Sequence, residues 1–188
     1  MARIINTFDP VERFVVGTVG EPGERSFFLQ ARTGNRLASV LLEKTQVIAI
    51  AERLEILLRE LRRLDPSMAI GRSEVDDQPL ETPIVEEFRV GVVSLSWLSD
   101  RSMVSIELQG VDENSAEDLA SIEIEEIFND DAAEGPDILR VILTPSQTDA
   151  FIKRATAVVN AGRPPCPFCG LALDPSGHLC PRANGYRR

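Results

Sequence analysis

The chain has 188 residues, of which 43% are hydrophobic and 27% charged, and its formal net charge is −10 at pH 7. This composition is ordinary for a soluble globular protein large enough for one sizeable core, and no apolar run reaches the roughly 18 residues of a membrane span. The first residues lack the basic and then apolar stretch of a secretory signal, so we expect a cytoplasmic protein with no membrane contact.

The charge is unevenly distributed along the chain. Residues 163–188 carry four arginines and one aspartate, a balance of +3, which leaves −13 on residues 1–162. Residues 112–137 hold eleven acidic side chains and no basic one. A surface of this sign repels the phosphates of nucleic acid. Any contact with nucleic acid is therefore expected only through residues 163–188.

The first half has the pattern of a three-stranded meander followed by a helix. Three segments rich in β-branched and aromatic side chains are separated by glycine-containing turns, at residues 13–19, 27–32 and 36–42. From Lys44 to Leu64 apolar residues recur every three or four positions, which is typical of an amphipathic helix. This stripe is wider and shorter than a coiled-coil seam, so we favour a helix packed on the sheet over a dimerising helix.

After a proline-containing linker at residues 66–86, the same order returns. Further strands are expected at residues 88–97, 103–108 and 138–143. Thr144-Pro145-Ser146-Gln147 then combines an N-cap threonine, a proline at the first helical position and a capping glutamine, which predicts the start of a second helix. The halves, residues 8–65 and 87–162, share a β-β-β-α order, which indicates either a duplication or a chance likeness of simple segments.

An acidic insert, residues 111–137, interrupts the second half. In one interpretation it is a cation site or a surface that attracts a basic partner. In the other, which we favour, it is a solvated loop. Together the elements predict an α+β body over residues 1–162, in which antiparallel strands form one or two sheets with helices on one face.

All three cysteines and the only histidine of the chain lie in the C-terminal tail, which we define as residues 163–188. Cys166 and Cys169 belong to a Cys-x-x-Cys-Gly knuckle, a loop in which both sulfurs reach one metal ion. We expect Gly170 to adopt a positive φ that lets backbone N–H groups point at the sulfurs. The tail therefore begins with half of a metal site.

The second half of the site follows a turn at residues 174–177. His178 and Cys180 are two residues apart and so project from the same face of the returning strand. Three thiolates and one imidazole complete a tetrahedral shell. The sequence therefore predicts one structural Zn²⁺ per chain, held in a C-terminal hairpin.

Other kinds of site remain as alternatives. A redox pair at Cys166 and Cys169 would normally open a helix after a strand, whereas this pair opens a turn. A catalytic zinc would keep one position open for water, for example with His178 unbound. Iron–sulfur clusters usually need four cysteines. No second histidine and no glycine-rich phosphate loop is present in the sequence, so we expect no catalytic residues.

The tail also offers a basic, exposed surface. Candidate contacts with an anion or a partner are its arginines and its tyrosine: Arg163, Arg182, Tyr186, Arg187 and Arg188. These side chains suit an acidic protein surface, RNA or a phosphate; alternatively, Arg182 and Arg187 fold back onto the acidic body. We favour a non-catalytic adaptor or regulatory module that binds another protein. An RNA- or nucleotide-binding factor is the alternative, and a metal-dependent hydrolase is a third.

Several stretches resemble a family of uncharacterised actinobacterial proteins of about this length. They are residues 8–14, 17–25 and 143–147, and the run from residue 162 to residue 187 with its CPxCG and HxCPRxNGYRR motifs. The resemblance covers nearly the whole chain and implies no activity. It carries over only the four metal ligands, Cys166, Cys169, His178 and Cys180, all of which match.

Overall fold

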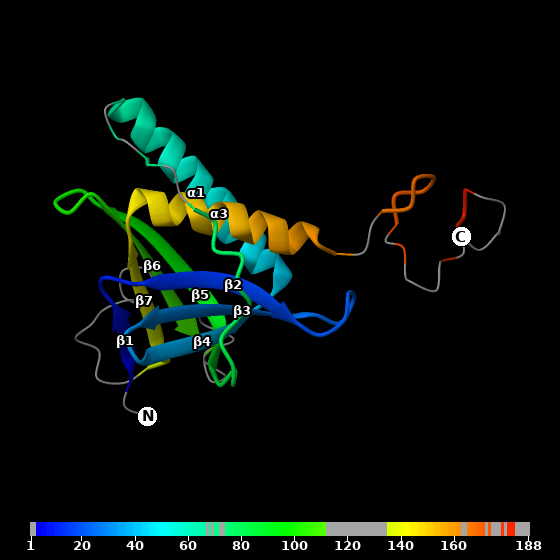
Figure 1. Ribbon diagram of the computed structural model, residues 1–188, viewed down its shortest axis with the longest axis horizontal. Coiled ribbons are helices and arrows are strands. Elements are labelled where there is room, and N and C mark those ends of the chain that lie inside the picture. The colour runs from blue at the N-terminus through cyan, green and yellow to red at the C-terminus, as the bar shows by residue number, and fades with distance from the viewer. Residues whose placement is uncertain are drawn as a thin grey trace.

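The structure, a computed structural model, describes residues 3–66, 68, 70–71, 74–111, 135–162, 165–171, 173, 178 and 180–182. This part of the chain forms one seven-stranded sheet with two helices on one face (Figure 1), which confirms the predicted α+β class. The elements are β1 Ile5–Phe8, β2 Arg13–Val19, β3 Ser26–Thr33, β4 Arg36–Leu42, α1 Lys44–Leu64, β5 Glu86–Leu98, β6 Met103–Gly110, β7 Ile138–Leu143 and α3 Pro145–Asn160.

The strand order is β1-β7-β6-β5-β4-β3-β2. The two predicted meanders, β2-β3-β4 and β5-β6-β7, are antiparallel within themselves. They join through a parallel β4–β5 pair, because α1 carries the chain back to the end of the sheet where β4 began. A second parallel pair joins β1 to β7. The sheet is therefore mixed, which corrects the expectation of antiparallel pairing throughout.

β1 was not among the strands expected from the sequence, because its four residues are too few to show a period. This strand lies at one edge of the sheet and β2 lies at the other, yet only residues 9–12 connect them. Seven flat strands would separate the edges by about 29 Å, whereas five residue steps reach at most about 18 Å. The sheet must therefore curl. A contact between β4 and the edge strand β1 confirms this curl: the guanidinium of Arg36 on β4 lies 4.8 Å from the centroid of the Phe8 ring on β1.

One hydrophobic core fills the space between the curled sheet and the helices. The ring of Phe14 on β2 stacks on that of Phe151 on α3, with centroids 4.7 Å apart. Fully buried side chains come from both halves, among them Leu29, Leu54, Ile106 and Leu143. The two β-β-β-α halves thus share a single core. Neither of the described helices is long and apolar enough to cross a membrane.

Both helices begin with the same device, a glutamine three residues after the N-cap. The side-chain oxygen of Gln46 accepts a hydrogen bond from the backbone N–H of Glu43 at 2.8 Å, and that of Gln147 accepts from Thr144 at 2.9 Å. Each amide group then donates to a carbonyl outside its helix, Gln46 to Val90 and Gln147 to Val11, both at 2.9 Å. The predicted N-terminal cap of α3 is confirmed, and the two halves match in detail at this point.

The segment assigned to a linker is packed against the body. Residues 76–81, which we call the strap, cross the face of β2 and β3 opposite the core (Figure 1). The buried side chain of Gln30 exchanges two hydrogen bonds with the backbone of Glu81, at 3.0 and 2.8 Å. A Cβ built on Gly17 would lie 2.6 Å from Cγ of Leu80. Only a glycine leaves room for the strap at this position.

Two arginines attach the strap around the edge of β2. Arg13 binds the Asp76 carboxylate through Nε and Nη2, at 2.6 and 3.2 Å. Arg154, an α3 residue only 8% exposed, donates to the carboxylate at 3.3 Å and to the carbonyl of Gln78 at 2.8 Å. The hydrogen bond from Arg13 holds the pKa of Asp76 below its ordinary value. The strap thus also protects an otherwise open sheet edge.

Replacing Asp76 with asparagine should destabilise the fold by about 2 kcal/mol, because Arg13 and Arg154 then lose their charge-assisted hydrogen bonds to the carboxylate. The folded pKa of Asp76 lies below its unfolded value, so its contribution is complete above the ordinary pKa of 3.8 and disappears as pH falls through the folded pKa. Urea unfolding of wild type and Asp76→Asn at neutral pH and near pH 3 measures this. The matched control is Glu60→Gln on the exposed face of α1, and an equal loss in both variants would contradict the assignment.

Candidate metal centre

The described part of the tail lies beyond the end of α3 and is set apart from the sheet (Figure 1). It contains Cys166, Cys169, His178 and Cys180, so all four predicted ligands can be placed. Cys166 and Cys180 are buried, and Cys169 and His178 are partly exposed. The arrangement of these four side chains decides whether the predicted site exists.

The knuckle is a tight loop closed by backbone hydrogen bonds. The N–H of Gly170 donates to the carbonyl of Cys166 at 2.8 Å, and the N–H of Cys166 donates to the carbonyl of Leu171 at 2.7 Å. Gly170 has φ of +76°, a conformation that side chains disfavour. The predicted positive φ is confirmed, and it lets the chain reverse within six residues.

The loop directs backbone N–H groups at its sulfurs. Burial would raise the pKa of the Cys166 thiol, but hydrogen bonds from the backbone of Cys169 and Phe168 outweigh it and lower the pKa. The pKa of Cys169 is raised, first by burial, although the N–H of Leu171 opposes this. Hydrogen bonds of this kind stabilise thiolates, and a bound cation would favour the thiolate form further.

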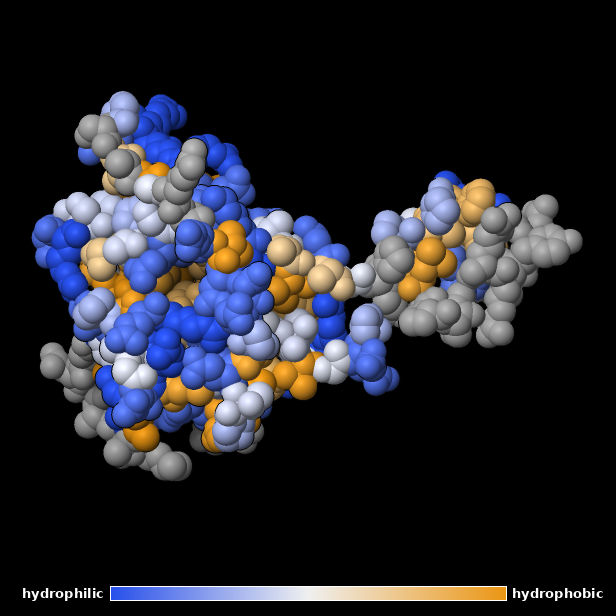
Figure 2. Space-filling view, in the orientation of Figure 1, coloured by the Kyte–Doolittle hydropathy of each residue, from blue (hydrophilic) through white to orange (hydrophobic). Residues whose placement is uncertain are grey.

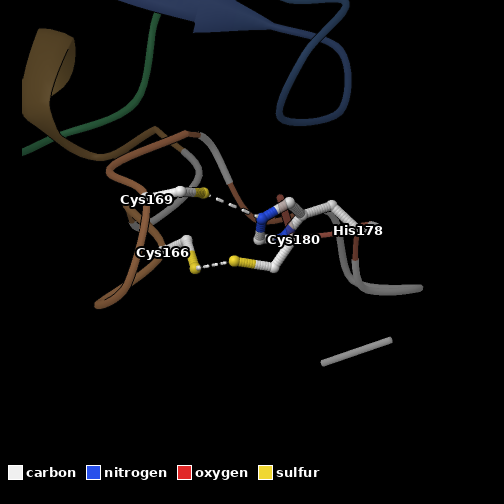
Figure 3. Close-up of side chains that lie close together, drawn as sticks. All are labelled: Cys166, Cys169, His178 and Cys180. Carbon is white, nitrogen blue, oxygen red and sulfur yellow. Dashed lines mark hydrogen bonds between the residues drawn. The ribbon is translucent and has the colours of Figure 1, made fainter. Parts of the chain in front are cut away.

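The returning segment brings the second ligand pair onto the knuckle (Figure 3). Sγ of Cys166 lies 3.8 Å from Sγ of Cys180, and Sγ of Cys169 lies 3.2 Å from Nε2 of His178. All four ligand atoms lie within 4.8 Å of one another. Each close contact therefore joins one cysteine of the knuckle to one ligand of the returning segment.

The four ligand atoms lie close enough to hold a single metal ion. In a tetrahedral shell with metal–sulfur bonds of about 2.3 Å, neighbouring sulfurs lie about 3.8 Å apart, which is the observed Cys166–Cys180 separation. A disulfide needs about 2.05 Å, and all three cysteines are free. Nδ1 of His178 is buried and has no hydrogen-bond partner among the described residues. Nε2, which lies 3.2 Å from Sγ of Cys169, is the nitrogen that would bind a metal ion.

The other predicted contacts of the tail are only partly placed. Nη1 of Arg182 lies 3.4 Å from the carbonyl of Phe168, so this arginine folds over the knuckle rather than onto the acidic body. Arg163, Tyr186, Arg187 and Arg188 lie outside the described residues, as do the predicted turn at 174–177 and residues 112–134 of the acidic insert.

Two apolar residues beside the ligands were not among the predicted site residues. Phe168 is 44% exposed and Leu171 is 57% exposed, although both are large and hydrophobic. Their positions around Cys169 and Gly170 place them on the knuckle loop. Their exposure could have been predicted from the Cys-x-x-Cys spacing. In a tight knuckle, the side chains between and after the two cysteines cannot all face the metal.

Comparison with known proteins adds a family but no function. No curated protein and no solved structure matches the chain. The model of a family described as protein of unknown function (DUF3090) matches residues 6–180, a stretch that includes the sheet, the helices and all four ligands of the candidate metal centre. The chain therefore belongs to the DUF3090 family.

Proposed function

We propose that the tail is a zinc-ordered protein-binding module carried by the α+β body. In this proposal Cys166, Cys169, His178 and Cys180 hold one Zn²⁺ in a closed structural shell, and the knuckle displays Phe168 and Leu171 to a partner protein. The convergence of the four donor atoms within 4.8 Å is the observation that carries it.

The donor set favours zinc over other metals. Three sulfurs and one imidazole are soft to intermediate ligands that suit Zn²⁺ in tetrahedral geometry, whereas Mg²⁺ and Ca²⁺ prefer oxygen. Four protein ligands also leave no coordination position for water, which a zinc hydrolase would need. A closed shell therefore supports an organising role for the metal.

A structural metal ion would compensate for the small number of apolar residues in the tail. A segment this short, with few apolar residues, cannot bury enough surface to fold alone. Metal binding can contribute on the order of 10 kcal/mol to the folding of a small module. In this proposal the ion replaces the missing hydrophobic core, so the tail does not need to bury Phe168 and Leu171, which are 44% and 57% exposed.

The exposed apolar pair is what supports a protein partner. Figure 2 shows hydrophobic residues on the surface of the described tail, and in this view hydrophobic residues also lie among the polar ones on the body. Apolar and aromatic side chains at the centre of a contact supply most of its binding energy. RNA is the competing partner, and its best-placed contact among the described residues is Arg182, beside the carbonyl of Phe168.

Removing the metal should unfold the tail and leave the body folded, because every contact of the four ligands described here lies within the tail. Hydrogen exchange on Cys169→Ala, or on chelated wild type, should show lost protection at the N–H groups of Cys166 and Gly170. The thermal midpoint of the body should not change. Phe168→Ala, which retains all four ligands, is the control and should keep this protection. Protected amides in metal-free protein would refute a metal-dependent tail.

Partner binding should depend on the apolar pair and respond little to salt. In affinity capture from cell extract, Phe168→Ala/Leu171→Ala should lose the proteins that wild type retains, whereas Val85→Ala should retain them. Val85 is the matched control because it is 69% exposed and lies outside the tail. Binding that instead falls steeply between about 50 and 200 mM salt, and that survives the double substitution, would favour RNA.

A further inference from the structure

A cavity of about 500 Å³ lies where α3 ends and the tail begins. Its lining comes from the β2–β3 turn and the start of β3, from the first residue of α1, from the end of α3 with Gly162, and from the residue before Cys166. The lining residues that matter here are Arg25, Phe27, Lys44, Val159, Asn160 and Pro165. Its volume falls within the range of small-molecule sites.

The cavity is cationic although it lies on an acidic body. Arg25 and Lys44 both line it, and no carboxylate does so among the described residues. Neither side chain forms an ion pair with any described residue, whereas Arg13, Arg101 and Arg154 all bind carboxylates. Two unneutralised cations at one cavity attract anions selectively.

Arg25 is held in position for binding. Its Nη1 donates to the carbonyl of Ala161 at 3.3 Å, and its guanidinium lies 5.6 Å from the centroid of the Phe27 ring. Nη2 and Nε form no hydrogen bond with any described residue. A Cβ built on Gly162 would lie 3.2 Å from Nη2, so the glycine at this position keeps the guanidinium accessible.

We propose that this cavity binds a small organic phosphate. The phosphate group lies against Arg25 and Lys44, and the apolar part of the molecule packs against Val159 and Pro165. Charge decides between phosphate and carboxylate: a phosphomonoester carries about −1.5 to −2 at neutral pH and matches two cations, whereas a carboxylate neutralises only one. Asn160 supplies an uncharged polar group for the rest of the ligand. This site is separate from the metal ligands and does not depend on the proposed partner.

Calorimetric titration of the full chain with phenyl phosphate tests the site, with benzoate as the carboxylate probe. We expect saturable binding of one phenyl phosphate per chain and weaker binding of benzoate. Arg25→Gln and Lys44→Gln should each weaken phenyl phosphate by roughly tenfold or more, the usual loss of one charge-assisted hydrogen bond. Lys44→Arg keeps the charge and should retain binding.

The matched control is Arg62→Gln, which removes the same charge from the exposed last turn of α1, outside the cavity. Its affinity should stay within about twofold of wild type, since an exposed charge at a distance is screened by salt. Three results would overturn the proposal: no saturable binding of phenyl phosphate, an equal loss in Arg62→Gln, or benzoate binding as tightly as phenyl phosphate.

Discussion

The short connection between β1 and β2 constrains the rest of the body. Residues 9–12 must join the two edges of a seven-stranded sheet, and they can do so only if the sheet curls. The curled sheet encloses a space that α3 enters, with Phe151 stacked on Phe14 and Gln147 bound to the carbonyl of Val11. The strap then attaches to α3 through Arg154. The closure of the sheet edges, the position of α3 and the attachment of the strap thus all depend on the curl of the sheet.

The same geometry determines where the tail leaves the body. Because α3 is fixed by the core along its length, its last residues meet the β2–β3 turn, where Arg25 binds the carbonyl of Ala161. The cationic cavity lies at this junction, and the knuckle begins immediately beyond it at Cys166. Two neighbouring features of different chemistry therefore meet at this junction: the cavity lined by Arg25 and Lys44, and the Cys/His loop that exposes Phe168 and Leu171.

Local patterns in the sequence predict much of this structure, and long-range contacts do not follow from them. The helices are evident because Gln46 and Gln147 mark their first turns and apolar residues follow at helical spacing. The candidate metal ligands are evident because the only thiols and imidazole of the chain lie within 15 residues, from Cys166 to Cys180. Asp76 gave no signal, since its partners Arg13 and Arg154 are 63 and 78 residues away. Parallel pairing at β4–β5 likewise depends on how α1 returns the chain, which no strand pattern records.

The central claim is that a closed Cys₃His zinc shell organises the tail. X-ray absorption at the zinc edge, on protein purified without added metal and paired with elemental analysis, tests it most directly. The account predicts one zinc per chain with three sulfurs at about 2.3 Å and one nitrogen at about 2.0 Å, and one fewer sulfur in Cys180→Ser. Protein without metal, or a shell that contains an exchangeable oxygen in wild type, would contradict it.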